Sequence, residues 1–210
     1  MNTQEKREAL ALLQDLYYDA KPALEYSTAY ELLVAVVLSA QCTDARVNIV
    51  TRELFKGHNT PEKMLTLSQE QLEKYIFSCG FYRNKAAHIL SASQDIVDRF
   101  GGEVPSTIEE LMSLAGVGKK TANVVYSVWF GGAAIAVDTH VFRVSNRLGL
   151  AKGKTPQQVE AGLMKAVPKS DWSKVHHQLI YHGRQICHSQ KPKCEVCPLA
   201  PLCDFAKKKQ

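Results

Sequence analysis

The sequence lacks an apolar run that could span a membrane. Its longest one, Leu32 to Leu38, covers seven residues, whereas a membrane-spanning helix needs roughly 20. The first residues, Met-Asn-Thr-Gln-Glu-Lys-Arg-Glu-Ala-Leu, lack the positive-then-apolar pattern of a secretory signal. Low-complexity segments and fixed-period repeats are also missing. We therefore expect a protein that has no membrane segment and stays in the reducing cytoplasm.

What is present fits a globular protein. The chain has 210 residues, of which 45% are hydrophobic and 22% charged, and its mean hydropathy is −0.19. A chain of this length can bury a sizeable core. Its balance of apolar and charged residues excludes a disordered chain.

The charge is unevenly distributed along the chain. The net charge is +5. Residues 1–105 hold 11 Lys and Arg against 14 Asp and Glu, a net of −3, and residues 106–210 hold 15 against 7, a net of +8. A basic second half is typical of a face that meets a polyanion such as nucleic acid, although a lysine-rich solvated surface gives the same count.

The apolar spacing predicts an all-α fold. Leucines three or four residues apart mark helical faces, and no stretch shows the alternation of a strand. Thr60-Pro61 is a helix start, and Ser68–Gln71 and Ser106–Glu109 both fit a capping box. The longer expected helices are about 5–19, 28–40, 44–55, 83–100, 119–130, 138–148, 155–167 and 171–187.

Four cysteines near the end of the sequence have metal-ligand spacing. Cys187, Cys194, Cys197 and Cys203 follow the pattern C-x6-C-x2-C-x5-C, with prolines in the intervening loops. Disulfides are rare in a reducing compartment, so a metal centre is the better interpretation. Thiolates suit zinc or an iron–sulfur cluster, and spacing alone does not choose between them.

The other cysteines and the lysines within the cluster segment have plainer interpretations. Cys42 and Cys79 lie in apolar helical surroundings and are expected to be small core residues. Lys191 and Lys193 lie between the first two clustered cysteines. On a loop ordered by its metal centre they could contact phosphates, or they could simply be solvated.

A glycine turn joins two expected helices at residues 114–122. Gly116 and Gly118 permit a tight turn, and the next helix starts at Lys119. The amides at such a helix start can bind an anion, which predicts a phosphate contact from Gly116, Val117, Gly118 and Lys119. A simple corner between helices is the alternative, since the turn lacks the third glycine of a dinucleotide fingerprint.

Lys120 and Asp138 are the candidate chemical pair. A helix N-terminus and the adjacent Lys119 both disfavour an extra positive charge on Lys120, which leaves more free amine for nucleophilic attack. Asp138 opens Asp-Thr-His-Val-Phe-Arg and is placed to cap a helix. We interpret the two as nucleophile and electrostatic partner, against the plainer alternatives of a solvated lysine and a helix cap.

Together these segments resemble the endonuclease III family of helix-hairpin-helix DNA glycosylases. The resemblance rests on the four-cysteine spacing and on three motifs: Leu-Ser-Ala-Gln-Cys-Thr-Asp at 38–44, Leu-Ala-Gly-Val-Gly-Lys-Lys-Thr-Ala-Asn-Val-Val at 114–125, and Val-Asp-Thr-His-Val-Phe-Arg-Val at 137–144. It implies two helical lobes with the active-site cleft between them. One is a six-helix barrel-like lobe over 21–131, with the hairpin at about 108–130. The other, 1–20 plus 132–210, carries a [4Fe–4S] cluster on the four cysteines.

The resemblance also implies an activity. Such enzymes remove oxidised or ring-damaged pyrimidines from duplex DNA and nick the strand at the abasic site by β-elimination. Lys120 would attack the sugar C1′ and form a Schiff base, and Asp138 would stabilise the developing positive charge. Double-stranded DNA, damaged or abasic, is then the partner, in the cytoplasm with the nucleoid. We expect a monomer.

The resemblance also implies two residues that insert into the DNA. Gln41 matches the residue that fills the gap left by the flipped base, and Phe81 stands where relatives carry a leucine or isoleucine wedge. Ala115 replaces the proline usual in the hairpin. Alanine at that position should loosen the turn slightly but removes no hydrogen-bond donor, whereas Phe81 leaves the opposite-base preference open.

Three alternatives remain at this point. A mismatch-specific adenine or thymine glycosylase would lack a lysine at the position of Lys120, which is present here. A pyrimidine-dimer glycosylase of the same superfamily would keep it. A non-catalytic iron–sulfur DNA-binding module would need neither Lys120 nor Asp138.

Overall fold

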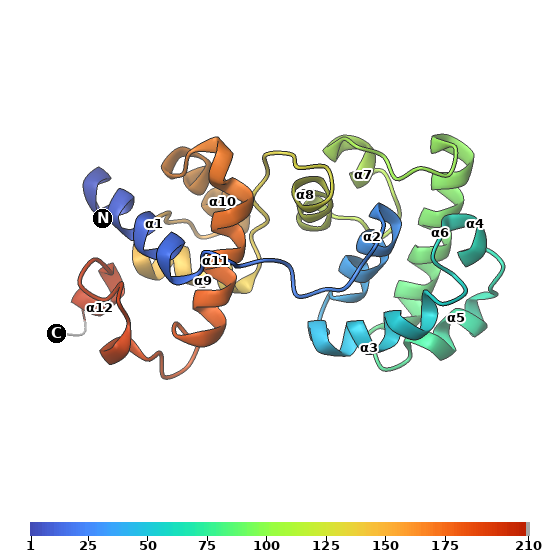
Figure 1. Cartoon of the computed structure of the whole chain (residues 1–210), viewed down its shortest axis with the longest axis horizontal. Coiled ribbons are helices and arrows are strands. Elements are labelled where there is room, and N and C mark those ends of the chain that lie inside the picture. Colours follow the sequence, from blue (N-terminus) through green and yellow to red (C-terminus); the bar gives the residue numbers. More distant parts are fainter. Residues whose placement is uncertain (209–210) are drawn as a thin grey trace. The chain divides into compact units, whose positions relative to one another are not determined.

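The computed structural model describes residues 1–208, and within that range the chain is helical and contains no strand (Figure 1). The all-α prediction is confirmed. Of the described helices, none is long and apolar enough to cross a membrane. The chain forms two compact units, residues 22–132 and residues 1–21 with the chain from 133 onward.

The unit of residues 22–132 is built around one apolar helix, α2. Residues 30–38 are all buried there, and Leu32 and Leu38 are fully so. The helices of this unit are α2 (Ala29–Leu38), α3 (Asp44–Leu54), α4 (Pro61–Met64), α5 (Gln69–Ile76), α6 (Tyr82–Phe100), α7 (Ile108–Met112) and α8 (Lys119–Val128). Because α8 packs on α2 and α7 on α8, the glycine turn is held against the core.

The second unit joins the two ends of the described chain. Its helices are α1 (Thr3–Leu16), α9 (Thr139–Leu148), α10 (Pro156–Ala166), α11 (Trp172–Gln185) and α12 (Asp204–Lys207), with short 3-10 turns at Lys169–Asp171 and Cys194–Val196. Helix α1 packs on α11 through a face that includes Ala9 and Leu13. The terminal ammonium of Met1 lies 3.1 Å from a carboxylate oxygen of Asp204, which ties α1 to α12.

Side-chain caps start most of the expected helices where the sequence places them. Thr28, Thr43, Thr60 and Thr155 each accept a hydrogen bond from the amide three residues on, and Ser68 forms the predicted capping box with Gln71. One prediction was wrong by a residue. The cap of α7 is Thr107, which pairs with Glu110. The spacing that suggested Ser106 and Glu109 recurs one residue later, so local sequence alone could not choose.

Candidate functional site

The glycine turn connects α7 to α8 and lies against α6. Gly116 has a φ of 75°, and a Cβ built on it would lie 2.8 Å from the Cβ of His88. Glycine is therefore required by conformation and by space. The Val117 amide donates to the carbonyl of Leu114 at 3.2 Å, and the Val117 side chain is buried. The turn is a fixed part of the unit.

Helix α8 begins directly at this turn. Its cap, Gly118, has no side chain to bond to the first amides. The Ala122 amide donates to the Gly118 carbonyl at 3.0 Å, which is the first bond of the helix, and the amides of a helix's first turn have no acceptor within the helix. Lys119 and Lys120 are exposed in this first turn. Positive charge and helix-start amides thus coincide at the predicted phosphate site.

Asp138 caps α9 in the other unit. Its carboxylate accepts a 2.7 Å hydrogen bond from the Val141 amide, so the helix-cap interpretation is confirmed, and the half-buried side chain is fixed in place. Lys120 and Asp138 belong to different units, and their convergence stays a prediction. His140 is a neighbour that sequence reasoning missed. Burial lowers its pKa, and the Asp138 charge opposes that shift.

Gln41 and Phe81 lie on two adjacent turns of the unit 22–132. Both are exposed, and both have left-handed backbone, with φ of 53° and 56°. A Cβ built on Gly80 would lie 3.4 Å from the Gln41 carbonyl, which shows how close the turns are. Left-handed φ is costly for side chains other than glycine and tends to occur at functional sites. The structure thus brings together two predicted site residues that are 40 positions apart.

The four clustered cysteines line one cavity in the second unit, whose walls include Leu148, Ile186, Ala200 and Phe205. Burial raises the pKa of Cys197, and the other three thiols raise it as neighbouring negative charges. Burial likewise raises the pKa of Cys203. Four thiolates here need a cationic partner, so the donor set fits an iron–sulfur cluster. Residues 1–208 hold no group of three or more His, Cys, Asp or Glu side chains placed for a single metal ion.

Backbone amides also point at the sulfurs. The Leu199 amide donates to Cys197, and the amides of Phe205 and Ala206 donate to Cys203; each bond lowers the thiol pKa. Such bonds favour thiolate, the form that ligates iron. The site therefore contains both the ligands and the groups that stabilise their charge.

Two arginines of α9 hold the segment that follows α11. Arg143 donates to the carbonyls of Cys187 and Gly183, both at 3.0 Å. Arg147 donates to the carbonyls of His188 and Ser189. The expectation that the metal centre alone orders this loop was incomplete. Within the held loop Lys191 is exposed and has a φ of 47°, and Lys193 is also exposed.

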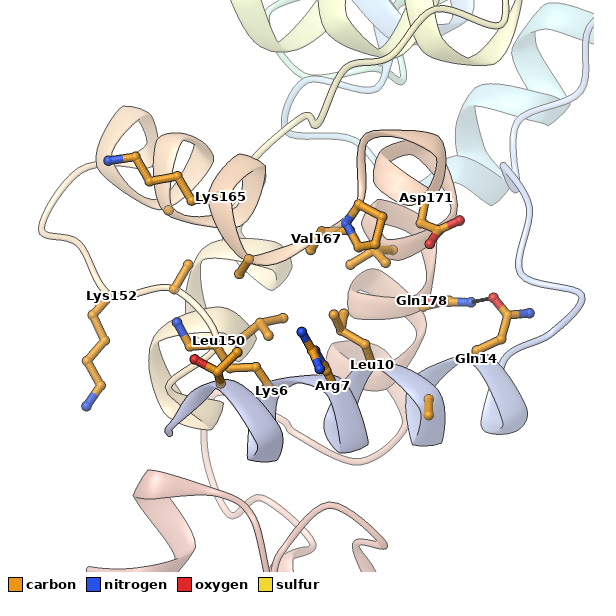
Figure 2. A pocket seen from close by; sticks show the side chains of 17 residues that line it. Lys6, Arg7, Leu10, Gln14, Leu150, Lys152, Lys165, Val167, Asp171 and Gln178 are labelled. Carbon is orange, nitrogen blue, oxygen red and sulfur yellow. Dashed lines mark hydrogen bonds between the residues drawn. The ribbon is translucent and has the colours of Figure 1, made fainter.

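A larger cavity, of about 910 Å³, lies in the same unit along α1 and contains none of the predicted site residues. Figure 2 shows Lys152 and Lys165 pointing away from it and Gln178 bonded to Gln14. Lys152 forms an ion pair with Asp204. The size of a cavity therefore does not identify the site in this protein.

The chain is similar to known proteins over its whole length. The profile of the HhH-GPD superfamily of base excision DNA repair proteins matches residues 34–169, and that of the iron-sulfur binding domain of endonuclease III matches residues 187–203. Endonuclease III of Bacillus subtilis is 49% identical over 210 residues, covering 100% of this chain and 96% of the relative. The chain belongs to the endonuclease III family.

Two solved structures agree with this membership. A trapped endonuclease III–DNA covalent intermediate, an estranged-adenine complex, has a TM-score of 0.96 and 48% sequence identity, and the match covers 100% of this chain and 99% of that one. A non-covalent endonuclease III–DNA complex has a TM-score of 0.95 at the same identity, covering 100% and 98%. The fold prediction is confirmed over the full length.

Membership confirms the main sequence predictions. This endonuclease III family member is a base-excision repair enzyme for oxidised pyrimidines, a bifunctional DNA glycosylase and AP lyase. Its predicted iron–sulfur cofactor is confirmed by the domain that begins at Cys187 and ends at Cys203. Family membership by itself assigns no role to an individual side chain.

Proposed function

We propose that Lys120 is the nucleophile of this enzyme and that Asp138 is its electrostatic partner. The observation that carries the proposal is the position of Lys120, exposed in the first turn of α8 directly after the glycine turn. A phosphate bound at that turn would place the adjoining sugar next to the amine. A trapped covalent intermediate with DNA of a relative at 48% identity supports a covalent mechanism for this chain, and the assignment to Lys120 is our proposal.

The reaction follows from the two groups. The Lys120 Nζ lone pair attacks C1′, and the glycosidic bond breaks with its electron pair leaving on the base. Loss of amine protons and opening of the sugar give an imine. Removal of a C2′ proton then expels the 3′ phosphate by β-elimination, and water releases the lysine. The Asp138 carboxylate stabilises positive charge on the sugar and assists proton transfer to and from the amine.

The remaining site residues bind the DNA. We propose that Gly116, Val117, Gly118 and Lys119 hold one phosphate, and that Lys191 and Lys193 hold the backbone elsewhere. Gln41 and Phe81 occupy the space of the flipped nucleotide, which offsets part of its lost stacking. When bound by Cys187, Cys194, Cys197 and Cys203, the [4Fe–4S] cluster cross-links four points of the lysine-bearing segment.

The setting follows from the same proposal. The partner is duplex DNA with a damaged pyrimidine or an abasic site, bound by a monomer in the cytoplasm with the nucleoid. The lobe assignment is 21–131 for the hairpin lobe and 1–20 plus 132–210 for the cluster lobe. The composition of the two compact units supports that assignment, because their division falls within a residue of those boundaries.

Borohydride trapping on a thymine-glycol duplex tests the two roles. Lys120→Gln keeps length and polarity but has no nucleophilic amine, so cross-linking should vanish while DNA binding persists. Lys119→Gln is the matched control, since it removes the neighbouring exposed lysine, and it should still cross-link. Normal cross-linking by Lys120→Gln would show that another amine is the nucleophile.

The variant Asp138→Asn removes the negative charge of this side chain but keeps its ability to cap α9. Asparagine caps helices as well as aspartate does, so α9 should keep its start. Base release should slow by roughly 100- to 1,000-fold, the usual cost of removing one stabilising group from a developing charge. On a pre-formed abasic site, which needs no base departure, part of the trapping should remain. Full base release by Asp138→Asn would exclude the electrostatic role.

A further inference from the structure

Lys85 is a buried lysine that the proposed mechanism does not use. It lies in the first turn of α6, and only 6% of it is exposed. Its ammonium donates to the carbonyl oxygen of Leu38 at 2.8 Å and to that of Ala40 at 2.7 Å. A lysine is almost never buried unless it is paired, and here the partners are two backbone carbonyls.

Those two carbonyls belong to the segment that leads into Gln41. Helix α2 ends at Leu38, where carbonyls have no helical partner and the helix dipole favours a cation. Ala40 directly precedes Gln41, whose φ is 53°. The lysine therefore fixes the peptide group at the entry to the left-handed residue.

The backbone of the same residue lies beside the second turn. The backbone amide of Lys85 donates to the carbonyl of Phe81 at 3.1 Å. Phe81 begins α6 in left-handed conformation and makes no side-chain cap. The ammonium of Lys85 thus bonds beside Gln41, while the backbone bond of the same residue, which does not depend on its side chain, places it beside Phe81.

The surroundings of the ammonium are apolar and sulfur-rich. Burial lowers the pKa of Lys85, and the nearby thiols Cys79 and Cys42 act in the opposite direction. Burial raises the pKa of Cys79 to about 11, and its hydrogen bond with Cys42 adds to the shift. The contacts of the ammonium that fix its position are its hydrogen bonds to the two carbonyls.

We propose that Lys85 is a positioning residue for base flipping: it locks the turns that present Gln41 and Phe81 to the DNA. It is buried and touches no substrate. Left-handed backbone is unfavourable at residues other than glycine, so these two turns persist only where surrounding contacts hold them. The inference rests on the proposed roles of Gln41 and Phe81.

Turnover on paired and unpaired substrates distinguishes a positioning role of Lys85 from a general loss of protein structure. Lys85→Met keeps the length and removes the donors. On a duplex with a paired thymine glycol its turnover should fall at least about tenfold, because small misplacements of inserting groups cost that much or more. On a single-stranded abasic site, which needs no flipping, the rate should stay near that of the parent. Equal losses on both substrates, or none on the duplex, would overturn the proposal.

Variants and controls keep the outcome interpretable. Lys85→Arg can still donate to both carbonyls and should restore most of the duplex activity, whereas Lys74→Met, on the exposed face of α5, should change nothing. If Lys85→Met does not fold, as judged by thermal unfolding, Lys85→Gln replaces it, because its side chain is uncharged and one bond shorter. Duplex activity of Lys85→Gln equal to that of the parent would then count against the lock.

The variants Phe81→Ala and Gln41→Ala distinguish a failure of the proposed wedge roles from a failure of the proposed role of Lys85. If neither is selective for the paired lesion, the proposed wedge roles fail. If both are selective but Lys85→Met is not, only the role of Lys85 fails. Combining Lys85→Met with Phe81→Ala should add little further loss, because the two changes act on one step. Full additivity would show that Lys85 acts elsewhere.

Discussion

The glycine turn between α7 and α8 and the cysteine-bearing segment at 187–203 are both short and irregular, but different interactions hold them. The backbone bonds of the turn are local, as from Val117 to Leu114, and one exposed side-chain bond reaches Ser113 from Arg99. The cysteine segment is held at its start by Arg143 and Arg147, whose bonds reach across 40 residues or more. The first is built by its own sequence, and the second depends on a distant helix.

In the proposed function both regions bind DNA, and the different interactions that hold them affect how their DNA contacts are positioned. Because the glycine turn is formed by local bonds, the two glycines are enough to leave its amides available to a phosphate. Lys191 and Lys193 depend on α9 and on the metal centre for their positions. The cysteine segment should therefore be the more sensitive of the two to changes made far away in the chain.

The largest expected effect is the loss of the cluster. Cys197→Ala removes one of four ligands, so the protein should lose its bound iron and sulfide, its yellow-brown colour and much of its solubility or DNA affinity. Iron and sulfide analysis with visible absorption measures this. Cys42→Ala, a cysteine of the other unit, is the control. A colourless parent protein with one zinc per chain would refute the iron–sulfur assignment.

The next effect tests the distant anchor. Arg147→Met removes bonds to the carbonyls of His188 and Ser189 and the stacking of its guanidinium 4.6 Å from the Phe205 ring centre. It should destabilise the protein by about 2–3 kcal/mol, the range for charged hydrogen bonds, and raise hydrogen exchange in residues 187–193. Arg99→Met, which removes exposed interactions with Asp95, Phe100 and the Ser113 hydroxyl, should cost far less. Equal costs would remove the contrast between the regions.

A smaller effect tests the turn itself. Gly116→Ala puts a Cβ against His88 at a φ of 75° and should cost about 2 kcal/mol of unfolding free energy. Gly118→Ala meets nothing within 4 Å, so it should cost less than about 1 kcal/mol, mostly through the cap. Denaturant unfolding of both variants measures the difference. If Gly118→Ala proves the more costly, the turn is not held as described.

The smallest effect concerns DNA affinity. Changing Lys191 and Lys193 together to alanine should weaken binding alike on all sequences, and the log–log salt slope should fall by about 1 for each phosphate that the lysines neutralise. Titrations of labelled duplex at several salt concentrations measure the slope. Lys6→Ala with Lys165→Ala provides a comparison from the face in Figure 2. An unchanged slope would assign the two loop lysines to the solvated surface.

Local sequence was enough for the helices and for the metal ligands. Threonine and serine caps lie next to the helices that they start, and the four cysteines are close in sequence, so short-range chemistry made both predictable. The cap of α7 was missed by one residue because Ser106 and Thr107 each have a glutamate three positions later. Only packing could decide between two equal local signals.

The sequence by itself determined the all-α fold, the glycine turn with Lys120 at its helix start, Asp138 as a helix cap and the four-cysteine site. Each depends on residues that are neighbours along the chain. Tertiary structure alone decided that Gln41 and Phe81 lie on adjacent strained turns, that the buried Lys85 bonds beside both, and that α9 anchors the cysteine segment. These interactions join residues about 40 positions apart, where no local pattern exists, because only the packing of helices brings such groups within hydrogen-bond distance.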